Sequence, residues 1–230
     1  MTRAMGEPAQ PAGRRSRMIV GITGASGIAY GIRMLEVLRT FDIETHLVVS
    51  KAADLTRAHE TDLSARALRA LSDEYHSNSD MAAPISSGSF RTIGMIVAPC
   101  SIRTLSDIAH GVTGSLISRA ADVVLKERRR LVLMVRETPL HAGHLKSMLA
   151  VTEMGGIIAP PVPAFYTGPT SVNDIVDHTV GRMLDLYDLD ASLFPRWGDP
   201  PELDIAELDG AELDRAALGS PRGDAQNTFD

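Results

Sequence analysis

Cysteine is almost missing from this sequence: Cys100 is the single one among 230 residues. One thiol excludes an internal disulfide framework and supplies no cluster of cysteine metal ligands. This composition is typical of a reducing compartment, and we expect a cytoplasmic protein. Because no histidine and asparagine partner pattern accompanies the thiol, we interpret Cys100 as buried and inert.

Long apolar runs and a basic face are missing as well. The longest uncharged stretch, residues 154–173, contains four prolines, which a membrane-spanning helix hardly tolerates. The net charge of −6 comes from 23 basic and 29 acidic residues, and nine of the acids lie in residues 199–230 beside two arginines. Residues 1–198 are therefore nearly neutral, and we expect neither a membrane nor a nucleic acid as partner.

Short β-branched runs alternate with amphipathic segments, and hydrophobic residues make up 44% of the chain. This pattern is typical of an α/β protein with a doubly wound parallel sheet, Rossmann-like or flavodoxin-like, in a single domain. We expect a disordered leader over residues 1–17, the domain over 18–198 and an acidic, disordered tail over 199–230. The expected strands are 18–23, 45–49, 94–99, 131–135 and 156–160, and the expected helices are 28–39, 52–58, 115–126, 140–154 and 172–187.

A glycine-rich turn, Gly24-Ala25-Ser26-Gly27, follows the first expected strand and opens a helix. Such a turn places free N–H groups at a helix N-terminus and is a candidate phosphate site, although it also serves as a plain tight connection. The spacing is not the dinucleotide fingerprint, and Ser50 stands where a ribose-binding acid is needed. The turn resembles that of short-chain reductases, but no tyrosine in the chain has a lysine four residues later.

Polar side chains follow two further expected strands. Ser101 and Thr104 come after the strand that ends at Pro99, and Arg136 with Glu137 follows the strand that ends at Val135. The carboxyl ends of parallel strands share one edge of a sheet, so these groups are expected to meet Ser26 and Ser50 there. An adjacent arginine and glutamate also form plain surface ion pairs.

Two pairs of side chains are spaced for one helix face. Arg119 and Lys126 are seven residues apart and suit a phosphate, or else face solvent. His141 and His144 are three apart, as in some metal sites, but no third ligand is suggested. We interpret the histidines as helix-end packing and capping groups.

Several stretches in this order closely resemble the UbiX-type flavin prenyltransferases, a family that includes small proteins encoded in phenolic and hydroxyarylic acid decarboxylase operons. They span about 180 residues, 18–197, and the leader, the acidic tail and Ser86 depart from the family pattern. The stretches are GITGASG, VVSKAA, HETD, SSGSF, APCSIRTLSDIAHG, LISRAADVVLKERRRLVL, VRETPLHAGHL, MGGIIAPPVPAFY and FPRWG.

The resemblance implies an enzyme that joins a dimethylallyl group from its phosphate ester to N5 and C6 of reduced FMN. It also implies a homo-oligomer, commonly a dodecamer, and delivery of prenylated FMN to a UbiD-type decarboxylase. Matched by motif, the FMN contacts are Gly24, Ala25, Ser26, Ser50, Ser101, Ile102, Arg103, Thr104 and Arg136. The prenyl phosphate would lie among Arg119, Lys126, Glu137, Tyr166 and Arg182, some of them from a neighbouring subunit. The resemblance assigns catalysis to Ser26, Glu60, Glu137 and Trp197, with Ser26 and Glu60 handling protons and Trp197 forming an aromatic wall.

The residue types agree with this chemistry. Breaking a C–O bond to phosphate leaves an allylic cation and a polyanion, so the site needs fixed cations at the leaving group. No Asp-rich box for Mg²⁺ is present, and we expect no metal. Two alternatives stay open: a flavin-dependent cysteine decarboxylase, whose related motif PASANT stands as PCSIRT here, and a non-catalytic FMN-carrying subunit of an aromatic acid decarboxylase.

Overall fold

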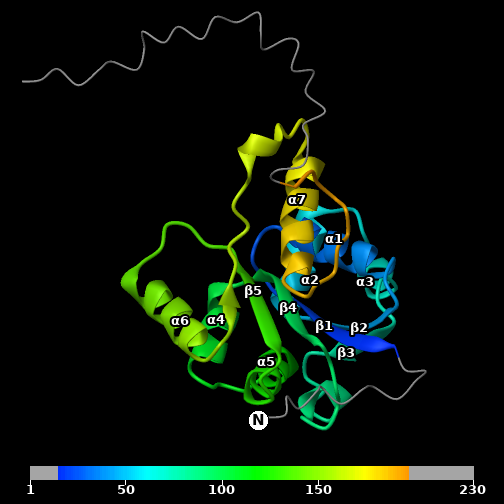
Figure 1. Cartoon of the computed structure of the whole chain (residues 1–230). Helices are drawn as coiled ribbons and strands as arrows, with labels where there is room; N and C mark the ends of the chain where they lie inside the picture. Colours follow the sequence, from blue (N-terminus) through cyan, green and yellow to red (C-terminus); the bar gives the residue numbers. More distant parts are fainter. Residues whose placement is uncertain (1–14, 197–230) are drawn as a thin grey trace, which may run out of the picture. The chain divides into compact units, whose positions relative to one another are not determined.

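The structure is a computed structural model that describes residues 15–196, and residues 15–194 belong to one compact unit (Figure 1). Trp197, the tail 199–230 and residues 1–14 of the expected leader lie outside the described residues. The strands are β1 (Ser16–Ile22), β2 (Ile43–Val49), β3 (Glu74–Ser77), β4 (Gly94–Cys100), β5 (Arg130–Val135) and β6 (Ile157–Ile158). The helices are α1 (Ile28–Leu38), α2 (Lys51–Glu60), α3 (Ala65–Arg69), α4 (Ile102–Ala109), α5 (Leu116–Lys126), α6 (Ala142–Glu153) and α7 (Val172–Asp185), with short 3-10 turns η1 (Pro84–Ser86) and η2 (Phe165–Thr167).

The six strands form one parallel sheet in the order β3-β2-β1-β4-β5-β6. This is the order of the Rossmann-type doubly wound sheet, and without the short edge strand β3 it becomes the flavodoxin order 2-1-3-4-5. The expected fold class is confirmed. The chain reverses its direction of winding between β1 and β4, and ligands of such sheets bind outside the carboxyl ends of the strands at this point.

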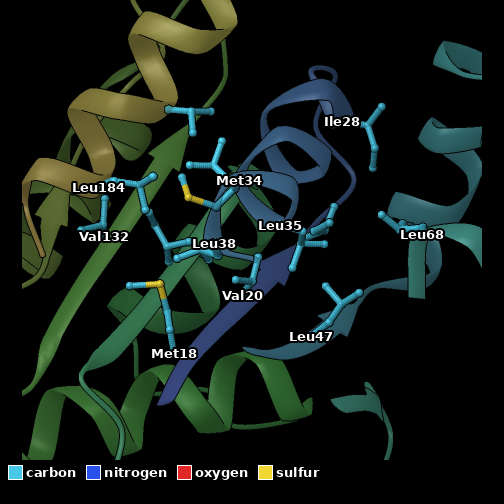
Figure 2. Packing of buried hydrophobic residues seen from close by; sticks show 14 of the residues in the cluster. Met18, Val20, Ile28, Met34, Leu35, Leu38, Leu47, Leu68, Val132 and Leu184 are labelled. Atoms are coloured by element: carbon cyan, nitrogen blue, oxygen red, sulfur yellow. The ribbon is translucent and has the colours of Figure 1, made fainter. Parts of the chain in front are cut away.

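Alternation along β1 divides the core between the two faces of the sheet. Met18, Val20 and Ile22 face α1 and α7, whereas Ile19 faces the cluster formed with α4, α5 and α6. Figure 2 shows Met34, Leu35 and Leu38 of α1 packed over the first of these faces, with Leu184 of α7 beside them. All of these side chains have at most 2% of their surface exposed, so both layers of helices are fixed against the sheet.

The expected strand and helix positions agree with the structure apart from their ends and some short elements. β1 begins at Ser16, two residues early, because Arg17 pairs in register with Glu44 and forms an ion pair with it at 3.1 Å. The expected leader is therefore too long by these residues. β3 was not predicted, since its sequence Glu-Tyr-His-Ser has no apolar run and it lies at an edge.

The last helix ends at Asp185, and the chain turns inward directly after it. Tyr187, expected to be helical, is buried and its hydroxyl donates a hydrogen bond to the carbonyl of Met95 at 2.7 Å. Within residues 15–196, no helix has the length and apolar character needed to cross a bilayer.

Candidate functional site

Thr23 joins the loops after β1 and β4 at the switch point of the sheet. Its hydroxyl donates to the carbonyl of Pro99 at 2.8 Å and accepts from the backbone N–H of Ser101 at 2.7 Å. The N–H of Ser50, after β2, donates to the carbonyl of Ile22 at 2.9 Å. Three loops are thus held together at one edge, as the sequence predicts. Thr23 itself was missed, although a hydroxyl at the end of a buried strand was its visible signal.

The glycine turn lies against the start of α2. A Cβ atom at Gly24 would be 2.4 Å from the Cβ of Ala52, so only glycine allows this approach. Gly27 is the N-cap of α1 and has φ of +104°, a left-handed conformation that favours glycine. The predicted strand, turn and helix start are confirmed.

Glu60, at the end of α2, caps the N-terminus of α1. Its carboxylate accepts from the N–H groups of Gly27 and Ile28, each at 2.9 Å, and from the hydroxyl of Ser26. Partial burial raises the pKa of Glu60, but these hydrogen bonds and nearby Arg136 outweigh it and hold the pKa below its usual value. The helix end expected to bind a phosphate therefore already holds a protein anion, and Ser26 and Glu60 form a pair.

The N-terminal ends of α2 and α4 offer two further sets of amide donors at this edge. Ser50 caps α2 by accepting from the N–H of Ala53 at 3.1 Å, and Ser101 caps α4 by accepting from that of Thr104 at 3.3 Å. Arg103, in the same first turn of α4, has 91% of its side chain exposed. The predicted FMN residues of this segment are therefore brought together at a helix N-terminus suited to a phosphate.

Arg136 and Glu137 leave β5 at the same edge. The N–H of Arg136 donates to the carbonyl of Cys100 at 3.1 Å, and its charge acts on both Glu60 and Tyr30. Glu137 is exposed, and its carboxylate accepts from the N–H of Thr138 at 2.9 Å. The structure thus joins Arg136 to the Ser26 and Glu60 pair and leaves Glu137 open to a ligand.

Arg119 and Lys126 make their contacts away from Ser26, Glu60 and Arg136. Arg119 donates to the carbonyl of Ser86 in η1 at 3.2 Å and pairs with Asp122 at 2.6 Å. Lys126 pairs with Glu127 at 2.5 Å at the end of α5, just before β5 begins. The crevice, the space outside the carboxyl ends of the strands at the switch point, lies at the opposite edge of the sheet from the point where β5 begins. Lys126 is therefore not part of the crevice of its own chain.

Tyr166 contacts α7 at His178, and Arg182 lies further along the same helix. The hydroxyl of Tyr166, in η2, is 3.3 Å from Nε2 of His178, which is one helical turn before Arg182. Arg182 is half exposed and pairs with Asp185 at 2.9 Å. His178 was not predicted, because a lone histidine on a helix gives no sign of what covers it.

Cys100 and the histidine pair have structural roles. Cys100 is fully buried, and burial raises the pKa of its thiol, which confirms the inert interpretation. His141 caps α6 by accepting from the N–H of Gly143 at 3.0 Å, and its ring lies 3.6 Å from that of His144. In residues 15–196, no group of three or more potential metal-ligating side chains is found.

The crevice fits a phosphorylated flavin better than a dinucleotide. It joins the N-terminal amides and capping hydroxyls of α2 and α4 to a cation, Arg136, and places Ser50 at the end of β2. A ribose-binding acid is missing at that position. A mononucleotide phosphate matches this donor set.

Comparison with known proteins agrees with this geometry. The family model described as Flavoprotein matches residues 8–184. The flavin prenyltransferase UbiX of Escherichia coli K12 is 58% identical over 184 residues, covering 79% of this chain and 97% of that protein.

Two solved structures are similar over most of the chain. AnUbiX, crystallised in complex with FMN and dimethylallyl pyrophosphate, has a TM-score of 0.80 and 56% identity, covering 81% of this chain and 100% of that one. A dodecameric FMN-dependent UbiX-like decarboxylase from Escherichia coli O157:H7 has a TM-score of 0.78 and 52% identity, covering 80% and 100%. The similarity thus spans nearly the whole length of these proteins.

Proposed function

This chain belongs to the Flavoprotein family, and within it to the UbiX-type flavin prenyltransferases, and from that premise we propose how its crevice performs the transfer. The reaction joins the dimethylallyl group of a prenyl phosphate to N5 and C6 of FMN. The observation that carries the proposal is the convergence of Ser26, Glu60 and Arg136 with the capped ends of α2 and α4 at the β1/β4 switch point. The relatives do not support the cysteine decarboxylase and carrier alternatives.

The capped helix ends hold the phosphate of FMN. Ser50, Ser101 and Thr104 supply hydroxyls, the first turn of α4 supplies N–H groups, and Arg136 supplies a positive charge. Gly24 and Ala25 let the backbone of the turn approach the ligand. When bound in its reduced form, FMN supplies the nucleophilic N5 and C6 atoms.

The prenyl phosphate is held by groups from two chains. Arg182, Tyr166 and Glu137 belong to the chain that holds FMN, whereas Arg119 and Lys126 reach in from a second copy. The position of Lys126 at the opposite edge of its own sheet supports this division. Positive charge stabilises the departing phosphate in the way that Mg²⁺ does in other prenyltransferases.

Two carboxylates divide the proton transfers. The lowered pKa of Glu60 keeps it ionised at neutral pH, which suits acceptance of a proton through the hydroxyl of Ser26. Glu137, exposed directly after the end of β5, takes up a proton from the bound prenyl phosphate and returns it to the phosphate oxygen that leaves. Trp197 forms an aromatic wall in this proposal.

The product passes to a UbiD-type decarboxylase in the cytoplasm. A site shared between copies requires a homo-oligomer, such as the dodecamer formed by the similar decarboxylase. Adding the reaction mixture to a purified, cofactor-free UbiD-type decarboxylase tests the transfer: activation is expected, and an inactive decarboxylase would exclude this recipient.

Mixed oligomers test the shared site. Arg136→Ala removes a crevice residue and Lys126→Ala removes a residue of the second copy, so each homo-oligomer is expected to be nearly inactive. Co-expressed with different tags and purified through both, the pair should recover activity, because about a quarter of the sites then combine an intact crevice with an intact Lys126.

The pair Arg136→Ala and Glu137→Gln serves as the matched control. Both residues lie in one crevice, so a mixed oligomer of these variants contains no intact site. No recovery is expected. Equal recovery in the two mixtures, or none in either, would contradict the shared site.

A further inference from the structure

His178 is a buried histidine that the reaction described above does not use. Only 8% of its surface is exposed, although it lies on the face of α7 opposite the core residue Val180. Tyr166 covers it from η2, with the two rings perpendicular and 5.8 Å apart, and Phe194 covers it with ring centroids 4.5 Å apart. His178 is therefore enclosed by groups from three segments.

The segment after α7 fits closely over this histidine. Figure 1 shows it running back along the helix, and a Cβ atom at Gly181 would be 2.5 Å from the ring of Phe194. Glycine at this position lets Phe194 lie against α7 and hold the imidazole ring in place. An enclosed ring keeps one orientation, which is what a positioning group needs.

The charged groups around His178 are those of the prenyl phosphate side. Arg182 follows it by one helical turn and Asp185 by two, while Tyr166 faces it from η2 and Phe194 adds no charge. Burial lowers the pKa of His178, the charge of Arg182 lowers it further, and Asp185 opposes them. At neutral pH the imidazole is uncharged and carries one hydrogen.

We propose that His178 positions Tyr166 for the prenyl phosphate by donating its Nε2 hydrogen to the phenol oxygen, 3.3 Å away. The oxygen of Tyr166 then accepts from His178, and the phenol hydrogen points outward to a phosphate oxygen. Tyr166 lies in a three-residue turn with 58% of its surface exposed, and this bond would set the direction in which its hydroxyl hydrogen points. The inference rests on the proposed function, since it takes Tyr166 as a ligand of the prenyl phosphate.

Two variants of His178 separate positioning from packing. His178→Phe keeps a ring under Phe194 but removes the donor, and we expect kcat/KM for dimethylallyl phosphate to fall about tenfold with FMN affinity unchanged. His178→Gln retains an N–H donor and should restore most of the loss. Thermal unfolding of both variants checks that they fold. Equal activity of the two variants and the unchanged chain would overturn the proposal.

A double-mutant cycle with Tyr166→Phe shows whether His178 acts through the hydroxyl. In the Tyr166→Phe background, His178→Phe should cause no further loss. Additive losses would contradict the proposal. A chain that forms no prenylated FMN before any substitution would instead contradict the proposed function, so the two failures are distinguishable.

The hydrogen on Nε2 gives a measurement that does not depend on activity. Solid-state ¹⁵N NMR of the full chain with labelled histidine, assigned with His178→Gln, reports which ring nitrogen is protonated. We expect Nε2–H near neutral pH. A hydrogen on Nδ1 with an unprotonated Nε2 would overturn the proposal, because Tyr166 would then donate inward.

Discussion

At the scale of single residues, Glu60 stabilises the start of α1 and is also the proton acceptor of the proposed reaction. It is separated by more than thirty residues from the turn that it caps, and its carboxylate holds both the first amides of α1 and the hydroxyl of Ser26. A negative charge at a helix N-terminus is stabilising, and the same charge makes Glu60 a proton acceptor near neutral pH. One carboxylate therefore shapes the turn and, in the proposed reaction, accepts a proton.

Glu60→Gln should destabilise the protein by about 0.5 to 1 kcal/mol at pH 7, because the amide keeps an acceptor but loses the charge. The pKa of Glu60 is lowered in the folded chain, so the stabilisation by the charge is present above the unfolded pKa and is lost as pH falls through the folded pKa. Urea unfolding at fixed protein concentration, at neutral and at acidic pH, measures both effects. A difference between the two proteins that persists in strong acid would contradict this account.

Glu137→Gln should impair prenyl transfer by about 10²- to 10⁴-fold and leave FMN binding nearly unchanged, since glutamine keeps the size but passes no proton. Glu137 follows β5 next to Arg136, and in the proposed site these two adjacent residues serve different ligands. Comparing FMN affinity with the rate of prenylated-flavin formation checks this. Normal turnover, or loss of FMN, would show that Glu137 is structural.

At the scale of elements, the turn between β1 and α1 and the start of α2 act as one unit. Gly24 allows their contact, Glu60 returns from the far end of α2 to cap α1, and Thr23 ties the turn to the end of β4. The position of each helix N-terminus at the crevice therefore depends on its neighbours. Because of this coupling, we expect the structure of the turn to change when even one carbon atom is added to it.

Gly24→Ala adds a methyl group that would meet the Cβ of Ala52 at 2.4 Å, a contact that backbone movement alone relieves. Overpacking of this kind costs about 1 to 3 kcal/mol, and we expect FMN to bind roughly tenfold more weakly. Gly114→Ala is the matched control, because its Cβ would meet no atom within 4 Å. Flavin titration of both variants is the measurement, and equal affinities would refute the close-contact argument.

Strand β2 and its neighbour, the edge strand β3, carry a histidine pair that is sensitive to acid. His46 donates to Glu44 through Nε2 at 3.0 Å, and its Nδ1 lies 3.0 Å from Nε2 of His76. Burial lowers the pKa of both histidines. Each is therefore uncharged in the folded chain at a pH where the unfolded chain already takes up protons.

Stability should fall as pH drops below about 6.5, with a slope of at most about 1.4 kcal/mol per pH unit for each proton. The double variant His46→Gln with His76→Gln should flatten this dependence, whereas His59→Gln, on the exposed end of α2, should not. Urea unfolding between pH 7 and 5 measures the slopes. An unchanged slope in the double variant would show that these histidines are not responsible.

At the scale of the whole molecule, sequence periodicity predicts the parallel sheet because buried strands such as β4 are continuous apolar runs. β3 is not predicted by periodicity, since an edge strand needs no apolar face. The capping of α1 by Glu60 is not predicted either, because the two are far apart in the sequence. Ser50, Ser101 and Arg136 were predictable as crevice residues because each directly follows the end of a strand. The distance of Lys126 from its own crevice was not, because position along a helix does not tell which copy it serves.

Activity should need no divalent metal, since in the proposed site Arg119, Lys126 and Arg182 supply the positive charge around the leaving phosphate. Turnover in excess EDTA should equal turnover without it. Loss of activity in EDTA that Mg²⁺ restores would contradict this prediction. The chelated and reloaded samples serve as controls for each other.

Prenylation of FMN at the β1/β4 crevice changes the mass of the flavin, which can be measured on the purified protein. Purified protein is incubated anaerobically with reduced FMN and either dimethylallyl monophosphate or diphosphate, and the extracted flavin is analysed by mass spectrometry. The account predicts a flavin heavier by one five-carbon prenyl unit with at least one donor, formed far more slowly by Glu137→Gln. Unmodified FMN with both donors would contradict it.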